Sequence, residues 1–274
     1  PLIAALGEGE NFIASDIAAV LSHTKRFFTL EEGEIAVASR CGITVYSPEG
    51  APVEKKVHTA TWDVEQARKD GYPHFMLKEI FEQPKALRDT IHPRLKDGLP
   101  SFEYDGIPEC LFKGRGRIHI VACGTAMYAG LVGRDLIETL ARIPVEVQIA
   151  SEFRYRDPIL SKDDLVVIIS QSGETADSLA VLRLAKQRGV PTLGVVNVAG
   201  STIAREADYV IYTHAGPEIA VASTKAYSVQ VSVMYLLAFA MARSARTLGE
   251  EEIRAKVEEL LQTVEKLPRV LEQN

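Results

Sequence analysis

Apolar and polar positions alternate most regularly in the part of the chain that begins near residue 117. Five apolar runs have the length and composition of β-strands, at residues 118–122, 145–150, 165–169, 192–196 and 209–212. The run at 165–169 has no polar position, which is typical of a strand covered on both faces. The segments between and after these runs have helical patterns, at residues 125–142, 175–188, 201–206, 222–243 and from about 250. This alternation predicts an α/β fold with a parallel β-sheet flanked by helices on both faces.

The first 115 residues have a different pattern. Short strand-like runs lie at residues 2–6, 27–30, 34–39, 43–46 and 53–61. Ser15 and Asp16 precede an apolar stretch as an N-cap precedes a helix. A second helix is predicted from residue 74 to about 91, with a kink at Pro84, and residues 96–116 are loop-rich. We therefore divide the chain into residues 1–61, a linker and helical lead-in at 62–115, and an α/β domain at 116–274.

Composition narrows the possible functions. The net charge is −6, so the chain has no basic surface overall that would attract nucleic acid, and any phosphate should be held locally. The three cysteines, Cys41, Cys110 and Cys123, are too few and too irregularly spaced for a disulfide framework or a zinc site, and they fit a reducing cytoplasm.

No signal peptide pattern is present, and the apolar run 229–242 is short for a membrane span, so we expect a buried core helix there. Since the sequence starts without Met and ends inside a helical pattern, we expect a piece of a longer chain.

Candidate chemistry lies where the predicted strands end. In an open parallel sheet, ligands bind outside the carboxyl ends of the strands. Three polar stretches occupy such ends or the helix starts beside them, at residues 124–126, 170–175 and 221–225.

The middle stretch carries the strongest signal. Ser170, Ser172 and Thr175 supply hydroxyl donors, Gln171 supplies amide donors, and a helix begins directly afterwards. A helix N-terminus with free N–H groups favours an anion, so this turn predicts a phosphate site. The alternative is that Ser172 or Thr175 is only the N-cap of the helix.

Other motifs are weaker. Lys225 could neutralise a ligand's charge or belong to a solvated helix face. No histidines are spaced as a metal site requires, and we expect neither a metal nor a cofactor. The dinucleotide and phosphate-loop fingerprints are absent from the sequence, which argues against a nucleotide-binding domain.

Four motifs together resemble a known family. In chain order they are Cys123-Gly-Thr125, Ser151-Glu-Phe-Arg-Tyr-Arg156, Ser170-Gln-Ser-Gly-Glu-Thr175 and Val221-Ala-Ser-Thr-Lys225. They resemble the first sugar isomerase (SIS) domain of the glutamine–fructose-6-phosphate transaminases, also called glucosamine-6-phosphate synthases. Residues 9–16 and 28–33 resemble the end of that family's glutaminase domain, an α+β Ntn-hydrolase fold, and residues 74–84 resemble the start of its isomerase half.

The resemblance implies a function and a set of ligand contacts. Members release ammonia from glutamine and use it to convert fructose 6-phosphate into glucosamine 6-phosphate, in the cytoplasm and as homodimers. By match, the phosphate would be held by Ser170, Gln171, Ser172 and Thr175. The sugar would lie against Thr125, Val221 and Ser223. Asp16 matches an aspartate that contacts the glutamine substrate.

The sequence also departs from the family pattern. Ala126 stands where many members have serine, so a hydroxyl contact is lost there. The nucleophilic cysteine at the N-terminus and the second SIS domain, which supplies the catalytic groups, are missing from these 274 residues, and we identify no catalytic residue. Alone, the chain is expected to bind sugar phosphate without turnover. The alternative function is a sugar-phosphate-sensing SIS module that regulates a partner, which the absence of a basic recognition helix disfavours.

Overall fold

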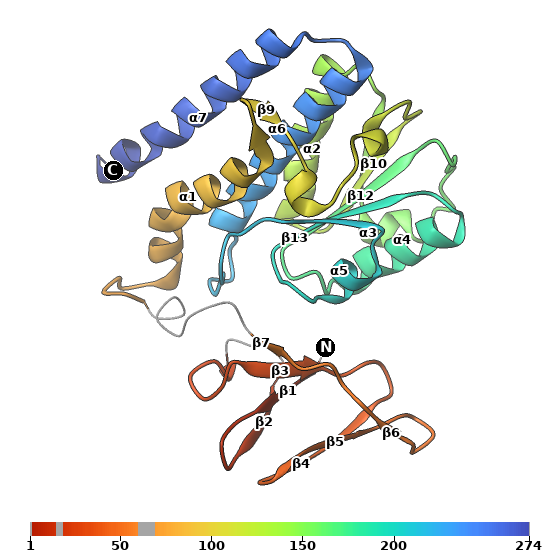
Figure 1. The fold of residues 1–274 in the computed structure, drawn as a ribbon, viewed down its shortest axis with the longest axis vertical. Helices are drawn as coiled ribbons and strands as arrows, with labels where there is room; N and C mark the ends of the chain where they lie inside the picture. The colour runs from red at the N-terminus through yellow and green to blue at the C-terminus, as the bar shows by residue number, and fades with distance from the viewer. Residues whose placement is uncertain (1, 15–18, 60–68, 274) are drawn as a thin grey trace. The chain divides into compact units, whose positions relative to one another are not determined.

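The computed structural model describes residues 2–14, 19–59 and 69–273, and it divides the chain into two compact units at Pro73 and His74. The residues before this division form antiparallel sheets (Figure 1). One sheet has the strand order β2-β1-β3-β7 and the other has the order β4-β5-β6. Their strands are β1 (Ile3–Leu6), β2 (Asn11–Ala14), β3 (Arg26–Thr29), β4 (Ile35–Ser39), β5 (Gly42–Tyr46), β6 (Pro52–Val53) and β7 (His58–Thr59).

The strand-like runs predicted in the first unit are confirmed, although the run expected at 53–61 is divided between β6 and β7. Strand β2 was not predicted. The start of the helix expected after Ser15 and Asp16 falls on residues 15–18, which lie outside the described part of the chain.

The second unit contains one parallel sheet of five strands in the order β11-β10-β12-β13-β14. Three of them, β10, β12 and β13, are labelled in Figure 1. These strands are β10 (Ile118–Ala122), β11 (Val145–Ile149), β12 (Leu165–Ser170), β13 (Thr192–Val196) and β14 (Tyr209–Tyr212). All six residues of β12 are buried, as its uninterrupted apolar run predicts. The predicted α/β class with a parallel sheet is confirmed.

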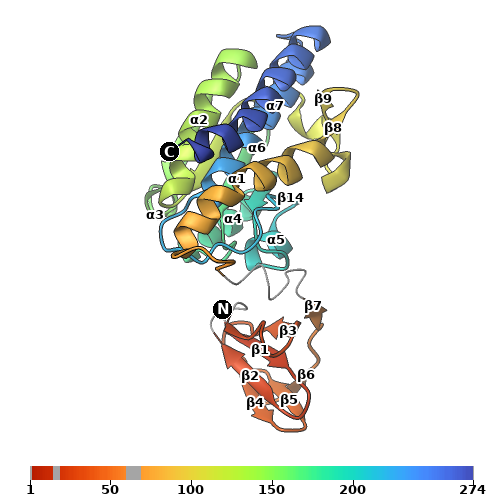
Figure 2. The same ribbon diagram turned by 90° about the vertical axis from the view of Figure 1, so that its left-hand side faces the viewer.

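Helices cover both faces of this sheet (Figure 2). One face packs against α1 (Phe75–Ile91), α2 (Thr125–Leu140) and α6 (Lys225–Ala245), and α7 (Glu250–Glu272) lies over α1 and α6. The other face packs against α3 (Ala150–Phe153), α4 (Ala176–Gln187) and α5 (Thr202–Glu206). The segment between α1 and β10 holds η2 (His92–Arg94), β8 (Leu95–Lys96), β9 (Leu99–Pro100), η3 (Glu103–Asp105) and η4 (Glu109–Phe112).

Two predicted elements differ in detail. Helix α6 begins at Lys225, three residues later than expected, and residues 150–153 form the short helix α3 rather than a loop. Helix α6 is long and apolar enough to cross a membrane, but 78% of its most apolar window is buried inside the protein. It is therefore the buried core helix that the sequence predicts.

Candidate functional site

The strand order locates the crevice in which a ligand can bind. From β10 the chain passes to β11 on one side and then returns to β12 on the other side. Helix α2, which follows β10, packs on one face of the sheet, and α4, which follows β12, packs on the opposite face. The two connections therefore diverge at the carboxyl ends of β10 and β12, which is the place where open α/β sheets bind their ligands. Because Ala122 is in register with Ile169, Gly124 and Thr125 lie beside the turn at Ser170–Thr175.

The turn after β12 is organised by its own hydroxyl groups. Ser170 Oγ accepts the N–H of Gly173 at 3.1 Å and lies 3.1 Å from Thr175 Oγ1. Ser172 Oγ accepts the N–H of Glu174 at 3.2 Å. Thr175 occupies the N-cap position of α4, but it makes no side-chain capping hydrogen bond. Thr175 therefore does not cap this helix with its side chain, and the hydroxyl groups of Ser170, Ser172 and Thr175 lie in the turn directly before it.

The segment that follows β13 is hydrogen-bonded to this turn. The N–H of Asn197 donates to Gln171 O at 3.1 Å, and the N–H of Ile203 donates to Gly173 O at 3.0 Å. Glu174 Oε1 accepts the N–H of Thr202 at 2.8 Å. Three hydrogen bonds thus connect the turn to the segment that follows β13.

Asn197 also ties this turn to the loop that follows β14. Its Nδ2 donates to Gly216 O at 2.7 Å, and its Oδ1 accepts from Thr213 Oγ1 at 3.2 Å and from the N–H of Ala215 at 2.9 Å. We did not single out Asn197 from the sequence. The sequence does contain a signal that could have identified it, because Asn197 is the first polar residue after the apolar strand β13.

The loop before α6 presents the third polar stretch. Val221 is fully exposed, and Ser223 Oγ donates to Glu218 Oε2 at 3.1 Å. Glu218 Oε1 accepts the N–H groups of Thr224 at 2.8 Å and Ala226 at 3.1 Å. This carboxylate satisfies the first turn of α6, which explains why the helix begins later than predicted.

The remaining sequence candidates have clear surroundings. Lys225 is buried and its Nζ lies 2.6 Å from Glu82 Oε2, so the solvated-face alternative is wrong. Thr125 is exposed at the start of α2, whereas Ala126 is buried in the apolar core. Arg154 forms a salt bridge of 2.7 Å with Asp177 in the first turn of α4. Asp16 lies outside the described residues.

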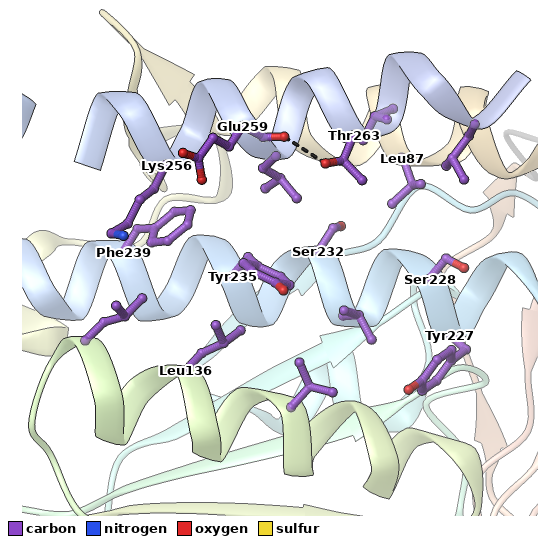
Figure 3. Close-up of a pocket in the computed structure, with 16 residues that line it drawn as sticks. Leu87, Leu136, Tyr227, Ser228, Ser232, Tyr235, Phe239, Lys256, Glu259 and Thr263 are labelled. Carbon is purple, nitrogen blue, oxygen red and sulfur yellow. Dashed lines mark hydrogen bonds between the residues drawn. The ribbon is translucent and has the colours of Figure 1, made fainter. Parts of the chain in front are cut away.

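A hydrophobic cavity of about 620 Å³ lies between the helices α2, α6 and α7 (Figure 3). Leu136, Tyr235 and Phe239 form much of its wall, and Lys256 and Glu259 are its only ionisable residues apart from the two tyrosines. None of the residues of the three polar stretches lines it. A phosphate dianion needs convergent N–H and O–H donors, so this cavity is not the phosphate site. Among the residues that the structure describes, no group of three or more His, Cys, Asp and Glu side chains is placed to hold a metal ion.

His214, two residues after β14, is expected to make the free energy of unfolding depend on pH. Burial and the nearby Arg94 guanidinium lower the pKa of His214, and its Nε2 is buried without a hydrogen-bond partner in the described part of the chain. The folded protein therefore favours the neutral ring, while the unfolded chain takes up a proton near pH 6.5. The free energy of unfolding should decrease as the pH falls below about 6.5.

His214→Asn should remove part of this pH dependence, because asparagine cannot be protonated and tolerates the positive φ of 45° at this position. Urea unfolding between pH 5 and 8 measures the free energy of unfolding. Its slope against pH should be smaller in the variant than in the unaltered chain. His92→Asn, an exposed histidine, serves as the control. An unchanged slope in His214→Asn would contradict the prediction.

The comparisons with known proteins agree with this architecture. Residues 111–240 match the family model of the SIS domain. Relatives named glutamine–fructose-6-phosphate aminotransferase (isomerizing) from Clostridium tetani and Chlorobaculum tepidum are each 50% identical to this chain, over 99% and 100% of its length. The relative of that name from Thermus thermophilus is 46% identical over 100% of the chain.

A solved structure is also similar. It is the C-terminal domain of glucosamine-fructose-6-phosphate aminotransferase from Francisella tularensis, with a TM-score of 0.69 and 43% identity, and the match covers 72% of this chain and 56% of that one. The chain spans about 45% of the length of the curated relatives. Residues 111–240 therefore match the SIS domain, and the chain is similar over its whole length to part of the relatives named glutamine–fructose-6-phosphate aminotransferase.

Proposed function

We propose that the second unit binds fructose 6-phosphate or glucosamine 6-phosphate in the crevice at the carboxyl ends of β10 and β12. The phosphate lies on the turn, against Ser170, Gln171, Ser172 and Thr175. The sugar extends toward Thr125 and the loop that carries Val221 and Ser223. The contacts come from hydroxyl, amide and backbone groups, so these residues bind and orient the ligand rather than transfer its protons.

One observation carries the proposal, the hydroxyl-rich turn whose Thr175 leaves the start of α4 uncapped. The partial positive charge of the helix and its free N–H groups favour a phosphate without help from lysine or arginine. The site has to bind phosphate without a cationic side chain, because the cations of the neighbouring motifs are already paired. Arg154 is paired with Asp177, and Lys225 is paired with Glu82.

The names of the relatives support the proposal that this site takes part in a reaction carried out by a longer protein. They are named as isomerizing aminotransferases that act with glutamine on fructose 6-phosphate. We propose that this chain holds the sugar-phosphate-binding part of that activity, within a cytoplasmic homodimer that binds neither nucleic acid nor membranes. Asp16 is proposed to contact glutamine, by match to the family.

Alanine substitution of the turn tests the binding site. Ser172→Ala and Thr175→Ala should each raise the Kd for fructose 6-phosphate about 10- to 100-fold, since a hydrogen bond to a charged group contributes about 1.5–3 kcal/mol. Isothermal titration calorimetry with the 274-residue chain measures the Kd. Thr263→Ala is the matched control, because Thr263 is exposed on α7 and its hydroxyl donates only to Glu259 O. The proposal fails if the unaltered chain does not bind, or if the two variants bind as tightly as it does.

A further inference from the structure

Helix α1 buries charged side chains that the proposed site does not use. Lys78 and Glu79 are only 3% and 1% exposed, and Glu82 follows one turn later. Residues three and four positions apart share one face of a helix, so these groups lie together. Charged side chains are rarely buried so completely unless they are paired, which calls for a reason specific to this face.

Glu79 binds the backbone just before the exposed Val221. Its Oε1 accepts the N–H of Ile219 at 2.6 Å and the N–H of Ala220 at 3.0 Å. A carboxylate that accepts two backbone N–H groups forms charge-assisted hydrogen bonds, which are stronger and more directional than neutral ones. Glu79 therefore fixes the path of the chain immediately before the proposed sugar contacts.

The loop is fixed on its other side as well. Glu218 accepts the N–H groups of Thr224 and Ala226 and the hydroxyl of Ser223. The part of the loop between these two anchors is exposed at Val221 and Ala222. Two carboxylates, one from α1 and one from the loop itself, thus determine the direction in which this short segment projects.

The charges of the cluster balance. Glu82 Oε2 lies 2.6 Å from Lys225 Nζ, and Glu82 Oε1 lies 3.6 Å from Lys78 Nζ. Both lysines therefore pair with Glu82, whereas the burial of Glu79 is offset by the two backbone N–H groups that its Oε1 accepts. The pairing also fastens α1 to the first residue of α6, the helix that the loop enters.

We infer that Glu79 is a positioning residue for sugar binding, which holds residues 219–223 so that Val221 and Ser223 face the ligand. This inference rests on the proposed function. Glu79 acts through the loop and not by touching the ligand. It therefore affects the sugar end of the ligand, while the phosphate turn belongs to β12 and α4 and is held by other contacts.

The unused oxygen of Glu79 allows a conservative test. Its Oε2 is buried and has no hydrogen-bond partner among the described residues. In Glu79→Gln the amide oxygen can still accept from Ile219 and Ala220, and the NH₂ group takes the place of Oε2. Glu79→Ala removes the acceptor altogether. Leu87→Ala is the matched control, because Leu87 is buried on the same helix but lines the apolar cavity instead of the loop.

Two ligands and an exchange measurement distinguish positioning from a general loss of stability. In Glu79→Ala, calorimetry should show a Kd for fructose 6-phosphate that is at least about tenfold higher, and Glu79→Gln should stay within about threefold of the unaltered chain. Binding of inorganic phosphate, followed by NMR shifts of the Ser172 and Gly173 amides, should change by less than about twofold in both variants. Hydrogen exchange of the Ile219 and Ala220 amides should accelerate in Glu79→Ala but not in Leu87→Ala.

The outcomes separate the two proposals. If the unaltered chain binds neither ligand, the proposed function falls and this inference falls with it. If the unaltered chain binds and Glu79→Ala binds equally well, only this inference is overturned. It is likewise overturned if phosphate and fructose 6-phosphate weaken together, if Leu87→Ala weakens sugar binding as much as Glu79→Ala does, or if the exchange of both amides is unchanged.

Discussion

Gly173→Ala is expected to abolish measurable binding of fructose 6-phosphate and to lower the free energy of unfolding by about 2–5 kcal/mol. Gly173 has a φ of 67°, which disfavours every residue with a Cβ atom. An added Cβ would lie 2.0 Å from Ser201 Oγ and 2.6 Å from Ser201 Cβ. Since Ser201 is buried at the start of α5, the turn itself must move, and its donors move with it.

Calorimetry and urea unfolding measure the two effects of this substitution. Gly249→Ala is the matched control, because Gly249 has a φ of −75° and no atom within 4 Å of an added Cβ. Adding Ser201→Gly to Gly173→Ala removes the clashing atoms but not the unfavourable φ, so it should restore stability only in part. Normal binding by Gly173→Ala would show that the turn does not hold the ligand.

Asp105→Ala should destabilise the second unit by about 3–5 kcal/mol, because it leaves a buried charge without its partner. Arg94 is fully buried, and its Nε and Nη2 donate to the two oxygens of Asp105 at 2.8 and 2.6 Å. The same guanidinium donates to Thr90 O at 2.6 Å and to Tyr212 O at 2.7 Å. Arg94 thereby joins α1 and the end of β14 to η3.

Urea unfolding followed by far-ultraviolet circular dichroism measures this loss. Glu103→Ala provides the comparison within the same short helix, since the Lys96–Glu103 pair is exposed and should matter far less. Replacing both partners, as in Arg94→Met with Asp105→Leu, should recover much of the stability that Asp105→Ala loses. An Asp105→Ala protein as stable as Glu103→Ala would contradict this account of the buried pair.

The sequence predicts the elements whose pattern is local. The apolar run of β12, the hydroxyl-rich turn after it and the helix α4 were all expected where they occur. The interior position of α6 was also expected, because its long apolar segment carries polar residues at only a few places. Strand β2 was missed since Asn11–Ala14 shows no alternation of polar and apolar residues, and only its pairing with β1 explains it.

The buried charges could not be predicted, because their burial depends on contacts between elements that no local pattern shows. Asp105 lies in the segment 96–116 that is predicted to be loop-rich, and Arg94 lies just before it, where charged residues are normally solvated. Glu79 lies on a correctly predicted helix, but the N–H groups it binds are 140 and 141 residues away. A single sequence gives helix periodicity but does not show which charged positions of a helix meet a distant loop.

The pairing of α1 with α6 has a consequence for how the chain is made. More than 130 residues separate the end of α1 from Lys225, with the whole parallel sheet between them. At a synthesis rate of about 5–20 residues per second, the ribosome needs roughly 7–27 s to cover that distance. During this interval Leu87 and Ile91 have no α6 to cover them, and Glu82 has no Lys225. The nascent chain therefore exposes an apolar helix face that is a natural target for chaperones until α6 has emerged.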